Sequence, residues 1–273
     1  MCAHTRVSRW VMSEPPSKSH GRLSISPSVA PRDLMSEPPA LAKAWCAQVI
    51  TLFPDVFPGV LGASLTGKAL DQGLWQLDPI DLRVFGEGKH RKVDDTPAGG
   101  GAGLVLRADI VGKAINFAMR RRKLPLVYLS PRGVPFDQAM ARRWATGPGV
   151  CLIAGRFEGL DQRVIDHFGI EEVSLGDFVM TGGEIAAQAM IDATVRLLPG
   201  VLGNAASAED ESFSEGLLEH PQYTRPAVWE GLGIPEVLTS GDHQAVETWR
   251  RAEAERLTRQ RRPDLMGKKS DGG

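Results

Sequence analysis

Three short apolar segments, each followed by a loop that contains glycine, most constrain how this chain can fold. Residues 126–130 and 150–154 have the length and apolar character of buried strands, and residues 172–175 begin a third strand. Segments with helical spacing of apolar residues lie between them. Strands that alternate with helices predict an α/β fold, in which a parallel sheet carries helices on both faces.

Other segments extend this pattern in both directions along the chain. Residues 46–52 are expected to form a strand that stops at Pro54. Thr181 and Glu184 have the spacing of a capping box, which predicts a helix that opens there and runs to about Leu198. The other expected helices span residues 68–73, 109–122, 136–144 and 160–167.

Composition divides the chain into regions. With 273 residues, 42% of them hydrophobic, the chain can bury one sizeable core and a small second unit. We expect residues 1–44, rich in Ser and Pro, to be a disordered extension or the product of a misplaced start codon. The other expected regions are a main domain at 45–203, a linker at 204–216, a small helical C-terminal domain at 217–266 and a tail at 267–273.

Charge and cysteine content exclude several classes of protein. The formal net charge of −1 argues against a nucleic-acid binder of the histone kind, although a local basic surface is compatible with it. Cys2, Cys46 and Cys151 show no CxxC spacing and the histidines no HExxH pattern, so we expect no disulfides and no metal site. No apolar run reaches the roughly 18 residues of a membrane helix, so we expect a soluble protein without membrane contacts. The odd number of cysteines without CxxC spacing fits a reducing compartment, and we expect the protein to be cytoplasmic.

Two glycine-rich segments resemble nucleotide-binding loops but do not satisfy the motifs. The sequence GASLTGKA at 62–69 has Ala69 where a phosphate-binding P-loop needs Ser or Thr, so we interpret it as a turn that opens a helix. The run GGGAG at 99–103 is followed by Leu104, where a dinucleotide-binding motif needs its third glycine. We expect this run to be a flexible loop that closes over a substrate.

Three loops at strand ends are the best candidates for a ligand site, because ligands of α/β sheets bind at the carboxyl ends of strands. The loops span residues 128–133, 155–159 and 175–183. They offer backbone groups, small residues and the carboxylates Glu158 and Asp177, which suit a neutral adenosine beside a cationic sulfonium. The alternative is that these loops are ordinary tight turns of an α/β core.

A basic segment at 249–262 interleaves arginine with glutamate. Most helices of this kind are solvated surface. The excess of arginine makes contact with RNA phosphates the second interpretation.

Taken together, these segments closely resemble the bacterial tRNA (guanine-N1)-methyltransferase family of the trefoil-knotted SPOUT class. The resemblance covers about residues 45–266, and several motifs in the right order are far more specific than any single one. The matching motifs are ITLFP at 50–54, RKVDD at 91–95, GGGAG at 99–103, YLSP at 128–131, GRFEG at 155–159, LGDFVMTGGE at 175–184, PGVLG at 199–203, GLLEHPQYTRP at 216–226, SGDH at 240–243 and RRPD at 261–264.

The resemblance implies a C-terminal trefoil knot, formed by the same three loops, that holds S-adenosylmethionine in a bent shape. It also implies a homodimer, in which one subunit holds the cofactor while the linker and C-terminal domain of the other help to hold the tRNA. The implied target is N1 of the guanosine at tRNA position 37, just 3′ of the anticodon, when another guanosine precedes it. The sequence does not decide whether magnesium takes part.

The resemblance also implies individual site residues. Arg196 matches the arginine that stabilises the reacting guanine, and Asp94 and Ser207 match further substrate-site positions. Phe157 and Phe178 stand where the family often has tyrosine, so hydroxyl contacts are absent there. The implied cofactor contacts are Tyr128, Leu129, Ser130, Pro131, Gly155, Glu158, Gly159, Leu175, Gly176, Asp177, Phe178, Val179, Met180, Gly182 and Gly183.

The general base departs from the family pattern, because the usual aspartate falls on Glu211, with Asp210 just before it. A carboxylate is a much weaker base than the guanine N1 anion, so complete deprotonation before attack is unfavourable. We expect proton removal coupled to attack on the methyl group, with Arg196 favouring negative charge at guanine O6. Glu211 is assigned as the base, and Asp210 is the alternative.

Other functions stay open on the sequence alone. A knotted methyltransferase acting on ribosomal RNA or on a ribose hydroxyl would keep the cofactor loops but would not need the acidic linker or residues 217–226. A non-enzymatic RNA-binding scaffold would have a degenerate pocket, and the intact loops, Arg196 and Glu211 count against it. A P-loop NTPase would require ATP binding at Lys68.

Overall fold

The computed structural model describes residues 44–202, 213 and 216–266, so the predictions for residues 1–43 and 267–273 lie outside the described residues. Residues 44–202 contain a five-stranded sheet in the order β2-β1-β6-β5-β7, and every pairing in it is parallel. The strands are β1 (Trp45–Thr51), β2 (Trp75–Asp81), β5 (Leu126–Pro135), β6 (Gly149–Ala154) and β7 (Glu171–Ser174).

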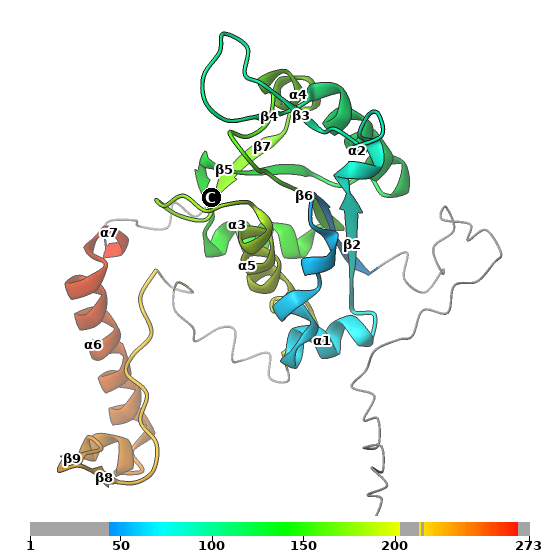
Figure 1. The fold of residues 1–273 in the computed structure, drawn as a ribbon. Helices are drawn as coiled ribbons and strands as arrows, with labels where there is room; N and C mark the ends of the chain where they lie inside the picture. The colour runs from blue at the N-terminus through cyan, green and yellow to red at the C-terminus, as the bar shows by residue number, and fades with distance from the viewer. Residues whose placement is uncertain (1–43, 203–212, 214–215, 267–273) are drawn as a thin grey trace, which may run out of the picture. The chain divides into compact units, whose positions relative to one another are not determined.

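Helices cover both faces of this sheet (Figure 1). Alternate residues of β6 point to opposite faces, so Val150 and Leu152 belong to one hydrophobic cluster while Cys151 and Ile153 belong to the other. The predicted α/β fold is therefore confirmed. The first cluster is completed by α1 (Ser64–Asp71), α3 (Gln138–Thr146) and α5 (Glu184–Val195), and the second by α2 (Ala108–Arg121) and α4 (Gln162–Phe168).

The edge strand β2 was missed by the sequence analysis. Its sequence, WQLDPID, contains polar residues and Pro79, and proline is expected to exclude a central strand. At the edge of the sheet, however, β2 needs only one hydrogen-bonded neighbour, which is β1. Trp75 at its start is fully buried and donates its indole N–H to the carbonyl of Thr66 at 3.0 Å.

The strand expected at 126–130 is longer than predicted, because Pro131 and Gly133 do not end it. The chain bulges between Leu129 and Val134, which both pair with Val173, and β5 then continues to Pro135. A β-carbon on Gly133 would overlap the backbone of Val173, so glycine is required where the bulge returns to β7. The first candidate ligand loop is thus a bulge within a strand.

The capping box predicted from Thr181 and Glu184 is also wrong. Gly183 is the N-cap of α5, and no side chain caps the helix. The Glu184 carboxylate instead accepts a hydrogen bond from the Thr51 hydroxyl at 2.7 Å. This tertiary contact, across 133 residues of sequence, replaces the local one.

Other helix boundaries differ by a few residues. The segment at 62–69 is a turn that opens a helix, as expected, but α1 begins at Ser64 rather than at residue 68. The helices α3 and α4 begin later than expected because Asp137 and Asp161 are their N-caps and accept hydrogen bonds from the backbone N–H groups of Met140 and Arg163.

Smaller elements complete residues 44–202. Two antiparallel strands, β3 (Asp94–Asp95) and β4 (Val105–Leu106), flank the glycine-rich run at 99–103. Single turns of 3-10 helix span Pro54–Val56, Gly59–Gly62 and Leu82–Phe85. Within the described residues, every helix is too short or too polar to cross a membrane.

Residues 216–266 are built around one long helix, α6 (His243–Arg261), whose N-cap Asp242 accepts hydrogen bonds from the backbone N–H groups of Gln244 and Ala245. The prediction of helix in this region is confirmed at α6. A short hairpin in the same region was not predicted. The remaining elements are β8 (Val228–Trp229), β9 (Leu232–Gly233), a 3-10 turn at Glu236–Thr239 and α7 (Pro263–Met266).

Candidate active site

A pocket of about 340 Å³ lies at the carboxyl ends of β5, β6 and β7, where the three loops singled out in the sequence meet. Its lining includes every residue expected to bind the cofactor except Asp177. The expected residues that line it are Tyr128, Leu129, Ser130, Pro131, Gly155, Glu158, Gly159, Leu175, Gly176, Phe178, Val179, Met180, Gly182 and Gly183. Residues not expected there are Arg132, Arg156, Phe157, Leu160, Val173, Ser174, Thr181 and Ala186.

The ring of Tyr128, in the first loop, lines the pocket and lies against the two glycines at the ends of the second loop. A β-carbon on Gly155 would lie 2.7 Å from the ring, and one on Gly159 would lie 2.7 Å from the hydroxyl oxygen. Glycine at both positions therefore makes room for the phenol. Burial of Tyr128 raises the pKa of its hydroxyl above the ordinary value of 10.0, against smaller opposing effects from Arg132 and the Leu160 backbone.

The third loop is held against the second by backbone contacts. Gly183 donates its N–H to the carbonyl of Gly155 at 2.9 Å. A β-carbon on Gly183 would lie 2.8 Å from the α-carbon of Ala154, so this close approach requires glycine. At the start of the loop, the Ser174 hydroxyl donates to the carbonyl of Gly176 at 3.0 Å.

Arg156 links the second and third loops through its side chain, and sequence analysis did not select it. Its guanidinium donates to the Glu184 carboxylate at 2.9 Å and to the Thr181 carbonyl at 3.1 Å. It also lies over the Phe53 ring, 4.4 Å from the centroid. Glu184 is 3% exposed and accepts a further hydrogen bond from Thr51. The sequence offers little indication of these contacts, because it shows only that Arg156 and Glu184 carry opposite charges and lie at or next to the ends of two candidate loops.

The glycine-rich run at 99–103 is joined to the pocket rim through its C-terminal end. Glu158 donates its backbone N–H to the carbonyl of Leu104, and Leu106 donates to the carbonyl of Gly159, both at 2.9 Å. Asp94, an expected substrate contact, is half-buried on β3 opposite Leu106 and is not among the residues that line the pocket.

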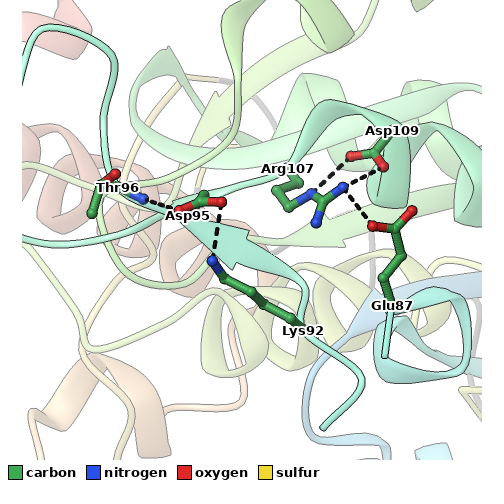
Figure 2. A network of polar contacts seen from close by, with 6 residues as sticks. All are labelled: Glu87, Lys92, Asp95, Thr96, Arg107 and Asp109. Atoms are coloured by element: carbon green, nitrogen blue, oxygen red, sulfur yellow. Dashed lines mark hydrogen bonds and ion pairs between the residues drawn. The ribbon is translucent and has the colours of Figure 1, made fainter. Parts of the chain in front are cut away.

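Charged side chains brace the strands on either side of this run (Figure 2). Arg107 donates to Asp109 and to Glu87, both at 2.8 Å. Lys92 pairs with Asp95 at 3.0 Å, and this hydrogen bond is the main reason that the pKa of the Asp95 carboxyl lies below its usual value. Arg107 thereby ties the segment after the run to Glu87, while the Lys92–Asp95 pair is local, and the pairing of β3 with β4 joins the two ends of the run.

Arg196 lies away from the pocket of its own chain. It is the C-cap of α5, while Glu184 at the start of the helix lies beside the pocket. Twelve helical residues separate the two ends, which corresponds to about 18 Å. The expected base Glu211, its alternative Asp210 and the expected substrate contact Ser207 lie outside the described residues.

Comparison with known proteins gives the family. A family model described as tRNA (Guanine-1)-methyltransferase TrmD matches residues 46–268. The chain belongs to the tRNA (guanine-N1)-methyltransferase family. The match extends from β1 to the residues just beyond α7, so it takes in the pocket, the glycine-rich run and the helical C-terminal region.

Relatives in this tRNA (guanine-N1)-methyltransferase family are similar over most of their length. A tRNA (guanine-N(1)-)-methyltransferase of Jannaschia sp. (strain CCS1) is 66% identical over 86% of this chain and 97% of its own. One of Ruegeria pomeroyi is 67% identical over 85% of this chain and 96% of its own. One of Bradyrhizobium diazoefficiens is 60% identical over 81% of this chain and 88% of its own.

Proposed function

We propose that this chain is a tRNA (guanine-N1)-methyltransferase that transfers a methyl group from S-adenosylmethionine to N1 of the guanosine at tRNA position 37, and that it acts in the cytoplasm. The observation that carries the proposal is the single pocket formed by all three strand-end loops, in a chain that belongs to this family. A degenerate RNA-binding scaffold is disfavoured because the pocket is open.

The pocket suits S-adenosylmethionine in size and chemistry. A volume of about 340 Å³ lies in the range typical of small-molecule sites. Apolar side chains such as Leu129, Leu160 and Leu175 line it for the adenine ring, and Glu158 offers a carboxylate to a cationic group. When bound, S-adenosylmethionine supplies an electrophilic methyl group on its sulfonium. The protein's part is to hold and orient it.

We further propose that residues 175–196 pass through the loop formed by the preceding strands, which makes the trefoil knot of the SPOUT class. Family membership supports the knot. So does the bulge in β5, because Leu129 and Val134 both pair with Val173 and residues 130–133 between them lie outside the pairing with β7. The Gly183 N–H bonded to Gly155 then fixes the emerging chain beside the second loop.

The position of Arg196 supports a homodimer with a shared active site. Arg196 lies about 18 Å along α5 from Glu184 and is not among the residues that line the pocket, which favours its acting on a guanine held at another subunit's pocket. In a two-fold dimer, Arg196 of one subunit would instead serve the pocket of the other. We also propose that residues 204–216 link the knotted domain to a tRNA-binding domain at 217–266.

The chemistry assigned to the protein's own residues is proton removal and charge stabilisation. Guanine N1 attacks the methyl group while the Glu211 carboxylate accepts the N1 proton. The Arg196 guanidinium favours the negative charge that develops on guanine O6. Single-turnover methyl transfer by Glu211→Gln and Asp210→Asn tests the base. Loss of chemistry in Asp210→Asn alone would contradict the assignment of Glu211.

The substrate assignment is tested with anticodon-loop variants of a tRNA transcript. The target guanosine and the guanosine before it are changed one base at a time, and the initial rate of methyl transfer is measured. We expect each change to abolish or strongly slow transfer. Methylation that is unaffected by either change would remove the assignment to position 37.

A further inference from the structure

One side chain, that of Arg156, contacts three other segments around the pocket. From its place in the loop after β6, the side chain lies over Phe53 after β1, donates to the Thr181 carbonyl in the third loop, and pairs with Glu184 at the start of α5. We propose that Arg156 is a positioning residue that locks residues 175–183 in the shape that binds the methyl donor. This inference rests on the proposed function of the pocket.

The contacts of Arg156 are well suited to hold a loop. The Glu184 side chain, taken by itself, is 5% exposed, and the guanidinium approaches its carboxylate through two nitrogens at 2.9 and 2.8 Å. Charge-assisted hydrogen bonds in such a shielded place are stronger than those on an open surface. The additional bond to the Thr181 carbonyl reaches the backbone of the loop itself, three residues before the helix begins.

The guanidinium also explains why position 182 needs glycine. A β-carbon on Gly182 would overlap Nε and Cζ of Arg156, so any side chain there displaces the arginine from Glu184. The neighbouring Gly183 has a different reason for being glycine, since its β-carbon would meet the backbone of Ala154 and Gly155. Substitution of Gly182 therefore disturbs a side-chain contact, whereas substitution of Gly183 disturbs a backbone contact.

This difference defines a double-mutant test. Binding of S-adenosylmethionine to the full chain is measured by titration calorimetry for Arg156→Ala, Gly182→Ala and the double variant. We expect each single change to weaken binding about tenfold or more, because each removes the same set of charged hydrogen bonds. The double variant should bind nearly as well as the weaker single variant, because nothing further is lost.

Gly183→Ala is the matched control for this cycle. Because its clash is with backbone, combining it with Arg156→Ala should multiply the two losses. Multiplied losses in both double variants would overturn the proposal, and so would equal binding by Arg156→Ala and the unmodified chain. If the unmodified chain itself fails to bind S-adenosylmethionine, the proposed function fails first, which distinguishes the two outcomes.

Further readouts separate positioning from general stability. Arg156→Lys keeps a cation for Glu184 but loses the fork that also reaches Thr181, so it should restore binding in part. In steady state, Arg156→Lys should raise KM for S-adenosylmethionine while KM for tRNA stays near its original value. Arg143→Ala removes the exposed pair with Glu171 and should change neither constant. Parallel rises in both KM values for Arg156→Lys would show a merely structural role and contradict the proposal.

Discussion

Gly103 has no room for a β-carbon because the side chain of Glu158 occupies the space beside its α-carbon. This contact joins the last glycine of the run at 99–103 to a carboxylate that lines the pocket. The two segments also share the hydrogen bond from the Glu158 N–H to the Leu104 carbonyl at 2.9 Å. The end of the glycine-rich run therefore packs directly against the rim of the pocket.

Gly103→Ala should displace Glu158 and lower methyl transfer by about tenfold or more, as expected for a misplaced polar group in a binding site. Gly99→Ala is the matched control, because Gly99 has a similar positive φ of 89° against 92° but nothing within 4 Å of a β-carbon. Initial rates at saturating tRNA compare the two. Equal losses of activity in the two variants would mean that backbone strain, and not the contact with Glu158, is the reason that position 103 requires glycine.

Thr51→Val should destabilise the protein by about 1–3 kcal/mol, because it leaves the buried Glu184 carboxylate without the 2.7 Å hydrogen bond from the hydroxyl. Thr51→Ser keeps the hydroxyl and should cost less. Chemical denaturation measures both free energies of unfolding. A valine variant as stable as the serine variant would show that this hydrogen bond contributes little.

Tyr128 should stay protonated beyond the pH at which an ordinary tyrosine ionises, since burial raises its pKa above 10.0. The folded state then binds this proton more tightly than the unfolded state. The associated stability is therefore complete below pH 10 and is lost as pH rises through the folded pKa. Tyr223→Phe leaves Tyr128 as the last of the two tyrosines, so phenolate absorbance reports on it alone. A midpoint at or below 10.0 would contradict the prediction.

Arg196→Ala and Gly155→Val should complement each other if the active site is shared. The first variant keeps a working pocket, while the second places a side chain against the Tyr128 ring and blocks its own pocket. Each alone should be inactive, and a random mixture of subunits should recover about a quarter of normal activity, from one working site in half of the dimers. Methyl transfer after joint refolding measures this. No recovery would place Arg196 and the pocket in the same subunit's site.

The sequence predicted those parts of the fold that depend on local pattern. Apolar strands 4–8 residues long between amphipathic helices gave the parallel sheet and both hydrophobic clusters. Local pattern does not predict the structure where tertiary contacts override it. Pro79 argued against a strand that in fact lies at the edge of the sheet. Pro131 argued against the continuation of a strand that resumes after a bulge.

The site shows the same division. The loops that line the pocket were predicted because glycine and carboxylate residues follow strands. Arg156 was missed because its partners Glu184 and Phe53 are distant in sequence, and no local spacing predicts that contact. Thr181 and Glu184 were misread as a capping box because the local pattern fits, although Thr51 takes the carboxylate in the folded chain.

Identification of the methylated nucleoside tests the proposed transfer to guanine N1. The full chain is incubated with a tRNA transcript carrying guanosines at positions 36 and 37 and with S-adenosylmethionine labelled in its methyl group. The RNA is then digested to nucleosides and separated by mass spectrometry. We expect the label to appear in 1-methylguanosine alone. Label in a 2′-O-methylated nucleoside or in another methylated base would contradict it.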